Sequence, residues 1–240
     1  MNPELKLFIE DLENTFGSEL VSVYLYGSAA AGDFIPGKSD YNLLVILKNL
    51  DAPELIKSRP AIREWIRLGG STPVFFTENE IIDAADVFPI EFHEMQKANK
   101  LLSGSDILKQ VIVSNDNLRH QCEFELRSKL LRLRRRFVQI CDSSEAIAAL
   151  LSESLPSISA IFSGVLTLNG KPVAPVKAER LKQFAQEFNL DYEVFNTILG
   201  LHSDKISKVN GLTQTIDLFN KYLREINKVI TLVNNFDDRQ

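Results

Sequence analysis

The sequence is poor in the residues from which metal centres and disulfide frameworks are built. Its 240 residues include only two cysteines, Cys122 and Cys141, far apart and outside any CxxC pair. Both occupy apolar positions of a helical pattern, which predicts buried free thiols. The three histidines, His93, His120 and His202, show no metal-ligand spacing. A zinc site, a disulfide-stapled fold and a Cys–His or Ser–His–Asp catalytic assembly are therefore not expected.

The chain also lacks an excess of positive charge and a long uninterrupted hydrophobic run. Its net charge of -5 and pI near 5.4 argue against a nucleic-acid partner, because proteins neutralise phosphate backbones with basic surfaces. The longest apolar stretches are broken by Ser, Glu and Pro, and the first residues are amphipathic and acidic, so we expect neither a membrane span nor a signal peptide. With 45% hydrophobic and 25% charged residues, the composition is that of a globular protein. We expect it to be cytoplasmic.

Two strands are predicted in the N-terminal part. Residues 20–26 (LVSVYLY) are rich in β-branched and aromatic side chains, and residues 41–47 (YNLLVIL) are almost continuously apolar, as in a central strand covered on both faces. A helix is predicted before them, between Pro3 and Gly17, and a short third strand over residues 74–76. The segment 88–95 is compatible with a further strand, although its pattern does not separate strand from helix.

Several short signals predict helix boundaries. Asp51 opens a helical stretch that Pro60 is expected to interrupt and that the pair Gly69-Gly70 ends. Thr77 with Glu80 has the spacing of a capping box, which predicts a helix start.

After about residue 115 the patterns become entirely helical. Apolar residues step by three or four from Leu118 to Cys141, Asp142 with Glu145 forms a second capping box, and residues 146–168 are apolar on nearly every side, as in a buried helix. Two more helices are predicted around residues 181–188 and 216–233. The fold class is therefore α+β: a mixed-sheet domain over residues 1–110, followed by an all-α helical bundle over residues 111–240. The bundle permits a homodimer without requiring one.

The segment that carries chemistry follows the first strand. Gly27-Ser28 comes directly after it, and a glycine there lets the backbone approach a phosphate chain while the next amides act as anion donors. Asp40 and Asn42 stand two residues apart at the start of the second strand and so project from one face. Oxygen donors in that arrangement are suited to a magnesium ion.

On these residues the sequence resembles the polymerase-beta-type nucleotidyltransferase superfamily, in particular small bacterial members such as the aminoglycoside nucleotidyltransferases. The family pattern is a strand, Gly-Ser, a loop, then Asp-hydrophobic-Asp on the next strand and a third carboxylate on a later one. Gly27-Ser28, Ser39-Asp40 and the LLVIL strand match it, and the resemblance spans roughly residues 5–105. It implies that Gly27, Ser28 and Ser39 bind nucleotide, and that Asp40 with Asn42 forms the catalytic metal site.

The sequence departs from this family pattern at three positions. Asn42, a neutral amide, replaces the second acid of the pair. Ala31 stands where the family usually has a basic residue before the second glycine. Thr72 occupies the place expected for the third carboxylate. Glu91 is an imperfect substitute for that carboxylate, and Glu91 and Glu78 are the candidates for a general base.

The resemblance implies a protein that binds a nucleoside triphosphate with Mg2+ and transfers the nucleotidyl group to a small-molecule or protein acceptor. Asp40, Asn42 and a triphosphate together can hold a single Mg2+ ion. The alternative is a catalytically inactive homologue that senses nucleotide or serves as a protein-interaction module. The three departures favour that alternative, and the family resemblance favours the enzyme.

Two further features are open to more than one interpretation. Trp65 is expected to belong to the core rather than to stack on a base. The strongest charge cluster is either a solvated helix face opposite a leucine stripe or a contact for a triphosphate, an acidic partner or RNA. It consists of Arg127, Lys129, Arg132, Arg134, Arg135 and Arg136.

Overall fold

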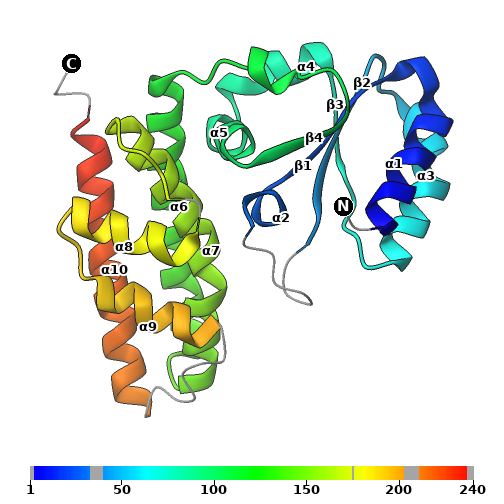
Figure 1. Ribbon diagram of the computed structural model, residues 1–240. Coiled ribbons are helices and arrows are strands. Elements are labelled where there is room, and N and C mark those ends of the chain that lie inside the picture. Colours follow the sequence, from blue (N-terminus) through cyan, green and yellow to red (C-terminus); the bar gives the residue numbers. More distant parts are fainter. Residues whose placement is uncertain (1–2, 33–39, 175, 203–210, 237–240) are drawn as a thin grey trace. The chain divides into compact units, whose positions relative to one another are not determined.

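A computed structural model of the protein describes residues 3–32, 40–174, 176–202 and 211–236. The chain divides into two compact units (Figure 1), which we call the α/β unit (residues 1–114) and the helical unit (residues 115–240). The first contains a mixed four-stranded sheet, and the described part of the second is built from helices alone. The predicted α+β fold class is confirmed.

The sheet of the α/β unit has the strand order β3-β2-β1-β4. β1 runs antiparallel to both β2 and β4, while β2 and β3 are parallel. The strands are β1 (Leu20–Tyr26), β2 (Asn42–Leu47), β3 (Val74–Thr77) and β4 (Asn99–Gly104). The helices are α1 (Pro3–Phe16), α2 (Ser28–Ala31), α3 (Ala52–Arg67), α4 (Glu78–Asp83) and α5 (Pro89–Lys97).

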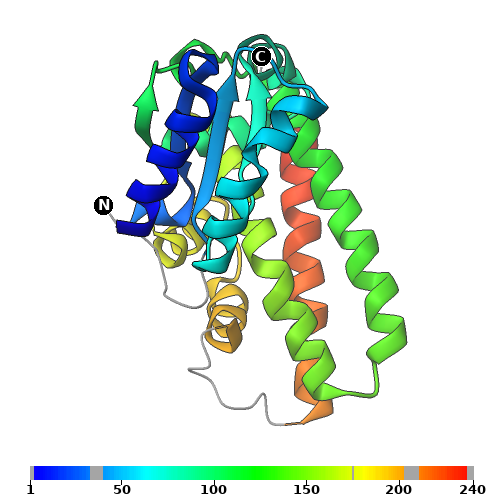
Figure 2. The ribbon, with the colours of Figure 1, turned by 90° about the vertical axis from the view of Figure 1, so that its right-hand side faces the viewer.

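The two central strands are buried on both faces, as their apolar sequences predict. On one face, Leu43 and Val45 belong to a core shared with α1 and α3, in which Trp65 is only 2% exposed. On the other face, Leu44 and Ile46 pack in a second core with α4 and α5. Figures 1 and 2 show the two pairs of helices on opposite sides of the sheet. The expected core position of Trp65 is confirmed.

One prediction about a helix in this unit is wrong, and one open choice between helix and strand is decided by the structure. Pro60 does not interrupt α3, which is continuous from Ala52 to Arg67. The carbonyl that Pro60 leaves without a donor belongs to Ile56, and Ile56 is 69% exposed, so water can satisfy it. The segment 88–95 is not a strand but lies largely in α5, which starts with Pro89 at its first helical position. The Asp51 cap and the Thr77–Glu80 capping box are both confirmed.

The helical unit is organised around one apolar helix. α7 packs against each of the other four, and Figure 2 shows the three longest helices, α6, α7 and α10, side by side. The bounds are α6 (Asn115–Ile140), α7 (Ser144–Leu168), α8 (Lys177–Glu187), α9 (Tyr192–His202) and α10 (Leu212–Asn234).

Two sequence-based expectations about the α6–α7 connection need correction. Cys122 is buried as predicted, but Cys141 is exposed, because α6 ends at Ile140 and the helical pattern no longer applies one residue later. Ser143, not Asp142, caps α7: its side chain accepts a hydrogen bond from the Ala146 amide at 3.1 Å.

By length and composition alone, α7 could cross a membrane, since its mean hydropathy reaches 1.4 over 18 residues. The Ser, Glu and Pro residues of α7, from which we expected no membrane span, therefore do not lower its hydropathy enough to exclude one. Half of that apolar window is buried within the protein, and α7 has helices on several sides. The packing thus accounts for the apolar sequence as that of a core helix. No other helix among the described residues meets the same criteria.

Candidate functional site

The turn after β1 has a backbone that favours glycine. Gly27 has φ +73° and ψ -148° and stands at the N-cap of the short helix α2. Its amide donates to the Ala98 carbonyl at 3.0 Å, and its own carbonyl accepts from Ala30 and Ala31. The amides of Ser28 and Ala29 come before these first helical hydrogen bonds, so helix geometry leaves them to outside acceptors.

Asn42 lies directly beside this turn. It pairs with Tyr26 across the β1–β2 ladder, and a methyl group added at Gly27 would come within 3.0 Å of the Asn42 Nδ2 atom. The Asn42 side chain therefore packs against the Gly27 backbone. The sequence named both residues, and the structure brings them together.

Asp40 is exposed and stands two residues before Asn42, ahead of the first residue of β2. Ser39, the third residue expected to bind nucleotide, lies outside the described residues. Ala31 ends α2, and Gly32 follows it in the left-handed conformation.

A chain of contacts ties the start of β3 to the start of β2. The indole Nε1 of Trp65 donates to the Ser71 carbonyl at 2.9 Å, and Ser71 Oγ donates to the Tyr41 carbonyl at 2.7 Å. Tyr41 stands between Asp40 and Asn42 in the sequence, and its ring lies 5.9 Å from that of Trp65. These contacts were not foreseen, since nothing in the local sequence pairs Ser71 with Tyr41.

The same contacts place Thr72 near Asn42. β2 and β3 pair in parallel starting from Leu44 and Val74, and Asn42 and Thr72 each stand two residues before that pair. Thr72 is exposed. The position at which the resemblance implies a third carboxylate thus carries a neutral hydroxyl.

The two glutamates considered for acid or base roles are placed differently from the expectation. Glu78 begins α4 beyond the far end of β3, about six residues or roughly 20 Å along the sheet from Asn42, so it does not belong to this edge. Glu91 is on helix α5 rather than on a strand, as an exposed side chain in the first turn of that helix. About two helical turns separate it from Ala98, the contact of Gly27.

The oxygen donors at this edge fit one magnesium ion better than two. Magnesium is commonly bound through one or two carboxylates together with substrate phosphates and water, and Asp40 supplies one carboxylate beside the Asn42 amide. Within the described residues, no group of three or more His, Cys, Asp or Glu side chains could hold a metal ion. One cation shared with a triphosphate suits this set, whereas a two-cation centre lacks the negative charge it needs.

His93, on helix α5, carries no charge at neutral pH. Burial and the nearby Lys97 lower the pKa of His93 to about 4, so the imidazole is neutral. Backbone amides and a bound cation are two sources of positive charge for a phosphate-binding site.

Replacing Gly27 by alanine tests the close approach of this turn to Asn42. We expect a loss of about 1–3 kcal/mol in the free energy of unfolding, because alanine is strained at φ +73° and its methyl group displaces the Asn42 amide. Gly32→Ala is the matched control, since Gly32 has φ +87° with nothing within 4 Å of the added methyl. Urea denaturation should show the larger loss for Gly27→Ala, and equal losses would contradict the contact.

Comparison with known proteins supports the fold. No protein-family model and no curated protein sequence matches the chain. Among solved structures, it is similar to the spectinomycin adenyltransferase AAD(9) from Enterococcus faecialis, crystallised with ATP and spectinomycin. The TM-score is 0.51 at 12% sequence identity, and the match covers 92% of this chain and 98% of that one. The chain therefore has the fold of a nucleotidyltransferase with its helical domain.

Proposed function

We propose that this protein binds a nucleoside triphosphate at the sheet edge formed by Gly27, Asp40 and Asn42, and that it transfers a nucleotidyl group to a small-molecule or protein acceptor. The observation that carries the proposal is the packing of the Gly27 turn on the Asn42 side chain, so close that a methyl group added at Gly27 would lie 3.0 Å from Asn42 Nδ2, in a chain that shares its fold with an adenyltransferase solved with ATP. A phosphate chain needs close backbone approach, and the turn supplies it.

The roles of the residues follow from their chemistry. The backbone after Gly27, the Ser28 hydroxyl and Ser39 would bind the phosphates. Asp40, with Asn42, would hold one magnesium ion, which neutralises phosphate charge when bound. In the transfer, the acceptor oxygen forms a bond to the α-phosphorus while the bond to the β-phosphate oxygen breaks and pyrophosphate leaves. The acceptor proton passes to solvent or to a base on the acceptor.

A second function, nucleotide binding without transfer, is favoured by the neutral side chains of Asn42 and Thr72. Two unit charges about 4 Å apart interact by about 4 kcal/mol at an effective dielectric of 20. An amide in place of a carboxylate forgoes attraction of that order to a cation. A site with one carboxylate fewer can still bind a nucleotide, because the nucleotide's own phosphates help to hold the cation. The same site stabilises the transition state of the transfer poorly.

Calorimetric titration with ATP and GTP, with and without magnesium, tests the proposed site. We expect magnesium-dependent binding that weakens by about tenfold or more in Asp40→Ala, because the single carboxylate is lost. Asp83→Ala is the matched control, since Asp83 is an exposed acid at the end of α4. A parallel pyrophosphate-release assay separates transfer from binding alone. If neither ATP nor GTP binds, both nucleotidyl transfer and nucleotide binding without transfer are contradicted.

Restoring the missing acid gives the complementary test. Asn42→Asp should raise magnesium affinity in the presence of nucleotide by about tenfold or more, because a second carboxylate then faces the cation. Titration of the variant with magnesium at fixed ATP measures the change. An unchanged affinity would show that Asn42 does not face a bound cation.

A further inference from the structure

The helical unit carries a concentration of positive charge that the proposed nucleotide site does not use. Residues 127–140 of α6 include six basic side chains and no acidic one. The α/β unit, by contrast, has 10 basic and 17 acidic residues, a net charge of -7, so the helical unit carries +2. The acidity of the whole chain therefore conceals a basic surface on one helix.

The basic residues of α6 differ in their ion pairs. Arg127 pairs with Glu123 at 2.8 Å, and Lys129 pairs with Glu125 at 3.0 Å. No ion pair joins Arg132 or Arg136 to any acid in the described part of the chain. These two guanidinium groups are separated by four residues, so they lie one above the other on the same side of the helix.

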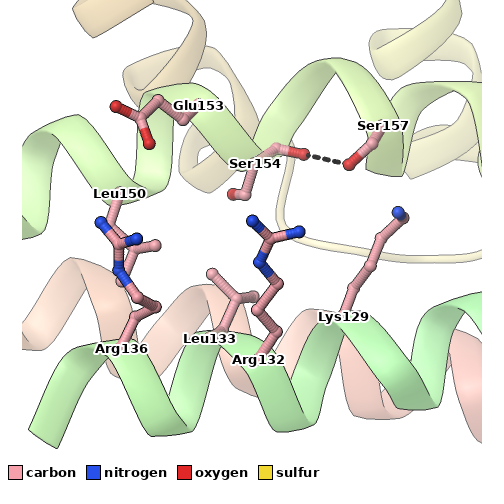
Figure 3. A pocket seen from close by; sticks show the side chains of 8 residues that line it. All are labelled: Lys129, Arg132, Leu133, Arg136, Leu150, Glu153, Ser154 and Ser157. Atoms are coloured by element: carbon pink, nitrogen blue, oxygen red, sulfur yellow. Dashed lines mark hydrogen bonds between the residues drawn. The ribbon is translucent and has the colours of Figure 1, made fainter.

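Arg132 and Arg136 line a hollow between α6 and α7 (Figure 3). The hollow has a volume of about 140 Å³, and Lys129 lines it on the same helix. From α7 it receives the hydroxyls of Ser154 and Ser157. Water occupies about 30 Å³ per molecule in the liquid, so a hollow of this size accommodates a phosphate group with its oxygens.

The lining has an uneven charge. Both hydroxyls donate to carbonyls of their own helix, Ser154 to Leu151 at 2.8 Å and Ser157 to Ser154 at 3.0 Å. The guanidinium groups therefore supply the attraction for an anion. Glu153 on α7 also lines the hollow and opposes that attraction.

The arrangement costs the helix stability unless an anion is present. Like charges four residues apart on a helix repel each other, and Arg132 and Arg136 face the same hollow with Glu153 as the one carboxylate among its lining residues. Guanidinium groups bind phosphate through paired hydrogen bonds, and two of them with an ammonium group match a dianion better than a single carboxylate.

We propose that the hollow between α6 and α7 binds the phosphate group of a small phosphorylated molecule through Arg132 and Arg136. This second anion site is formed by the helical unit alone. It needs no metal ion, because its charge comes from side chains. It also does not depend on the proposed nucleotide site, which is built from residues of the α/β unit.

Titration of the full chain with inorganic pyrophosphate and with glucose 6-phosphate, in EDTA at low salt, tests this site. We expect binding that raises the thermal midpoint of unfolding by mass action. The double variant Arg132→Gln, Arg136→Gln should weaken binding by about tenfold or more, while its midpoint without ligand should not fall, because a repulsion has been removed. If pyrophosphate binds and glucose 6-phosphate does not, the natural ligand is a free polyphosphate. If both probes bind, the hollow accepts a phosphate monoester.

Three controls on the same protein make the outcome specific. Arg134→Gln removes one positive charge from the exposed surface of α6 outside the hollow and should leave affinity nearly unchanged. Glu153→Gln should strengthen binding, because it removes the opposing carboxylate. Asp40→Ala should have no effect. The proposal is overturned if neither probe binds, or if Arg134→Gln weakens binding as much as the double variant. Tighter, steeply salt-dependent binding of an RNA oligonucleotide that also needs Arg134 would likewise overturn it in favour of a polyanion surface.

Discussion

Replacing Trp65 by alanine is expected to destabilise the α/β unit by about 3–5 kcal/mol, the usual cost of emptying a buried aromatic position. The indole is 2% exposed and stacks on Phe8 with the ring centres 5.0 Å apart. A methyl group added at Gly70 would lie 2.0 Å from it, which shows how closely the backbone encloses this ring. The cavity left by alanine would therefore be large.

The same substitution should loosen the proposed site. Trp65 holds the Ser71 carbonyl, and Ser71 holds the Tyr41 carbonyl, so the residues flanking Tyr41 lose their support. Amide hydrogen exchange of residues 42–47, resolved by peptide, measures the effect locally. Trp65→Phe is the comparison variant, because it keeps an aromatic ring in the core while it removes the indole N–H and part of the ring volume. Similar protection of these amides in wild type and Trp65→Ala would contradict the role given to the indole.

Alanine at Gly104 is expected to destabilise the unit by a similar amount, about 3–5 kcal/mol. Gly104 has φ +83°, and an added methyl would lie 1.9 Å from the Val21 carbonyl oxygen of β1. Neither partner is a flexible side chain, so the end of β4 must move away. That movement breaks the hydrogen bond from the Ser105 amide to the Val21 carbonyl and the one from the Tyr24 hydroxyl to the Ser105 carbonyl.

The chain contains one tryptophan, and it lies in the α/β unit, so its fluorescence during urea denaturation reports on that unit. Gly69→Ala is the matched control, with φ +88° and nothing within 4 Å of the added methyl. We expect Gly104→Ala to lose several times more stability than Gly69→Ala. Equal losses would mean that backbone strain, not the contact with β1, determines the cost.

The sequence predicted the elements whose patterns are local. Short stretches of sequence were enough to predict several elements. Examples are the apolar runs of β1 and β2, the helical periodicity of α6, and the capping box formed by Thr77 and Glu80. The predictions failed where the decisive partner is distant. β4 has few β-branched residues and exists because it pairs with β1, and no element was predicted over residues 192–202, where α9 packs against α7. In contrast, Pro89 at the start of α5 was a readable signal that was missed.

The candidate site shows the same division. Gly27, Asp40 and Asn42 could be named from the sequence because motif residues are close together there. Their support could not, because Ser71 reaches Tyr41 only after β2 and β3 pair. The positions of Glu78 and Glu91 could not be predicted either, because the sequence does not state which end of the sheet a later element occupies.

The two outer strands bear on how the protein behaves at high concentration. An exposed sheet edge is a template for another strand, and natural proteins protect such edges by shortness, proline or lysine. β3 has only four residues and follows Pro73, while β4 carries the exposed Lys100 and ends in the left-handed Gly104. Neither edge strand is long and regular enough to pair well with a strand of a second molecule. The short β3 and the lysine and glycine of β4 thus protect both edges of the sheet against pairing with a strand of another molecule.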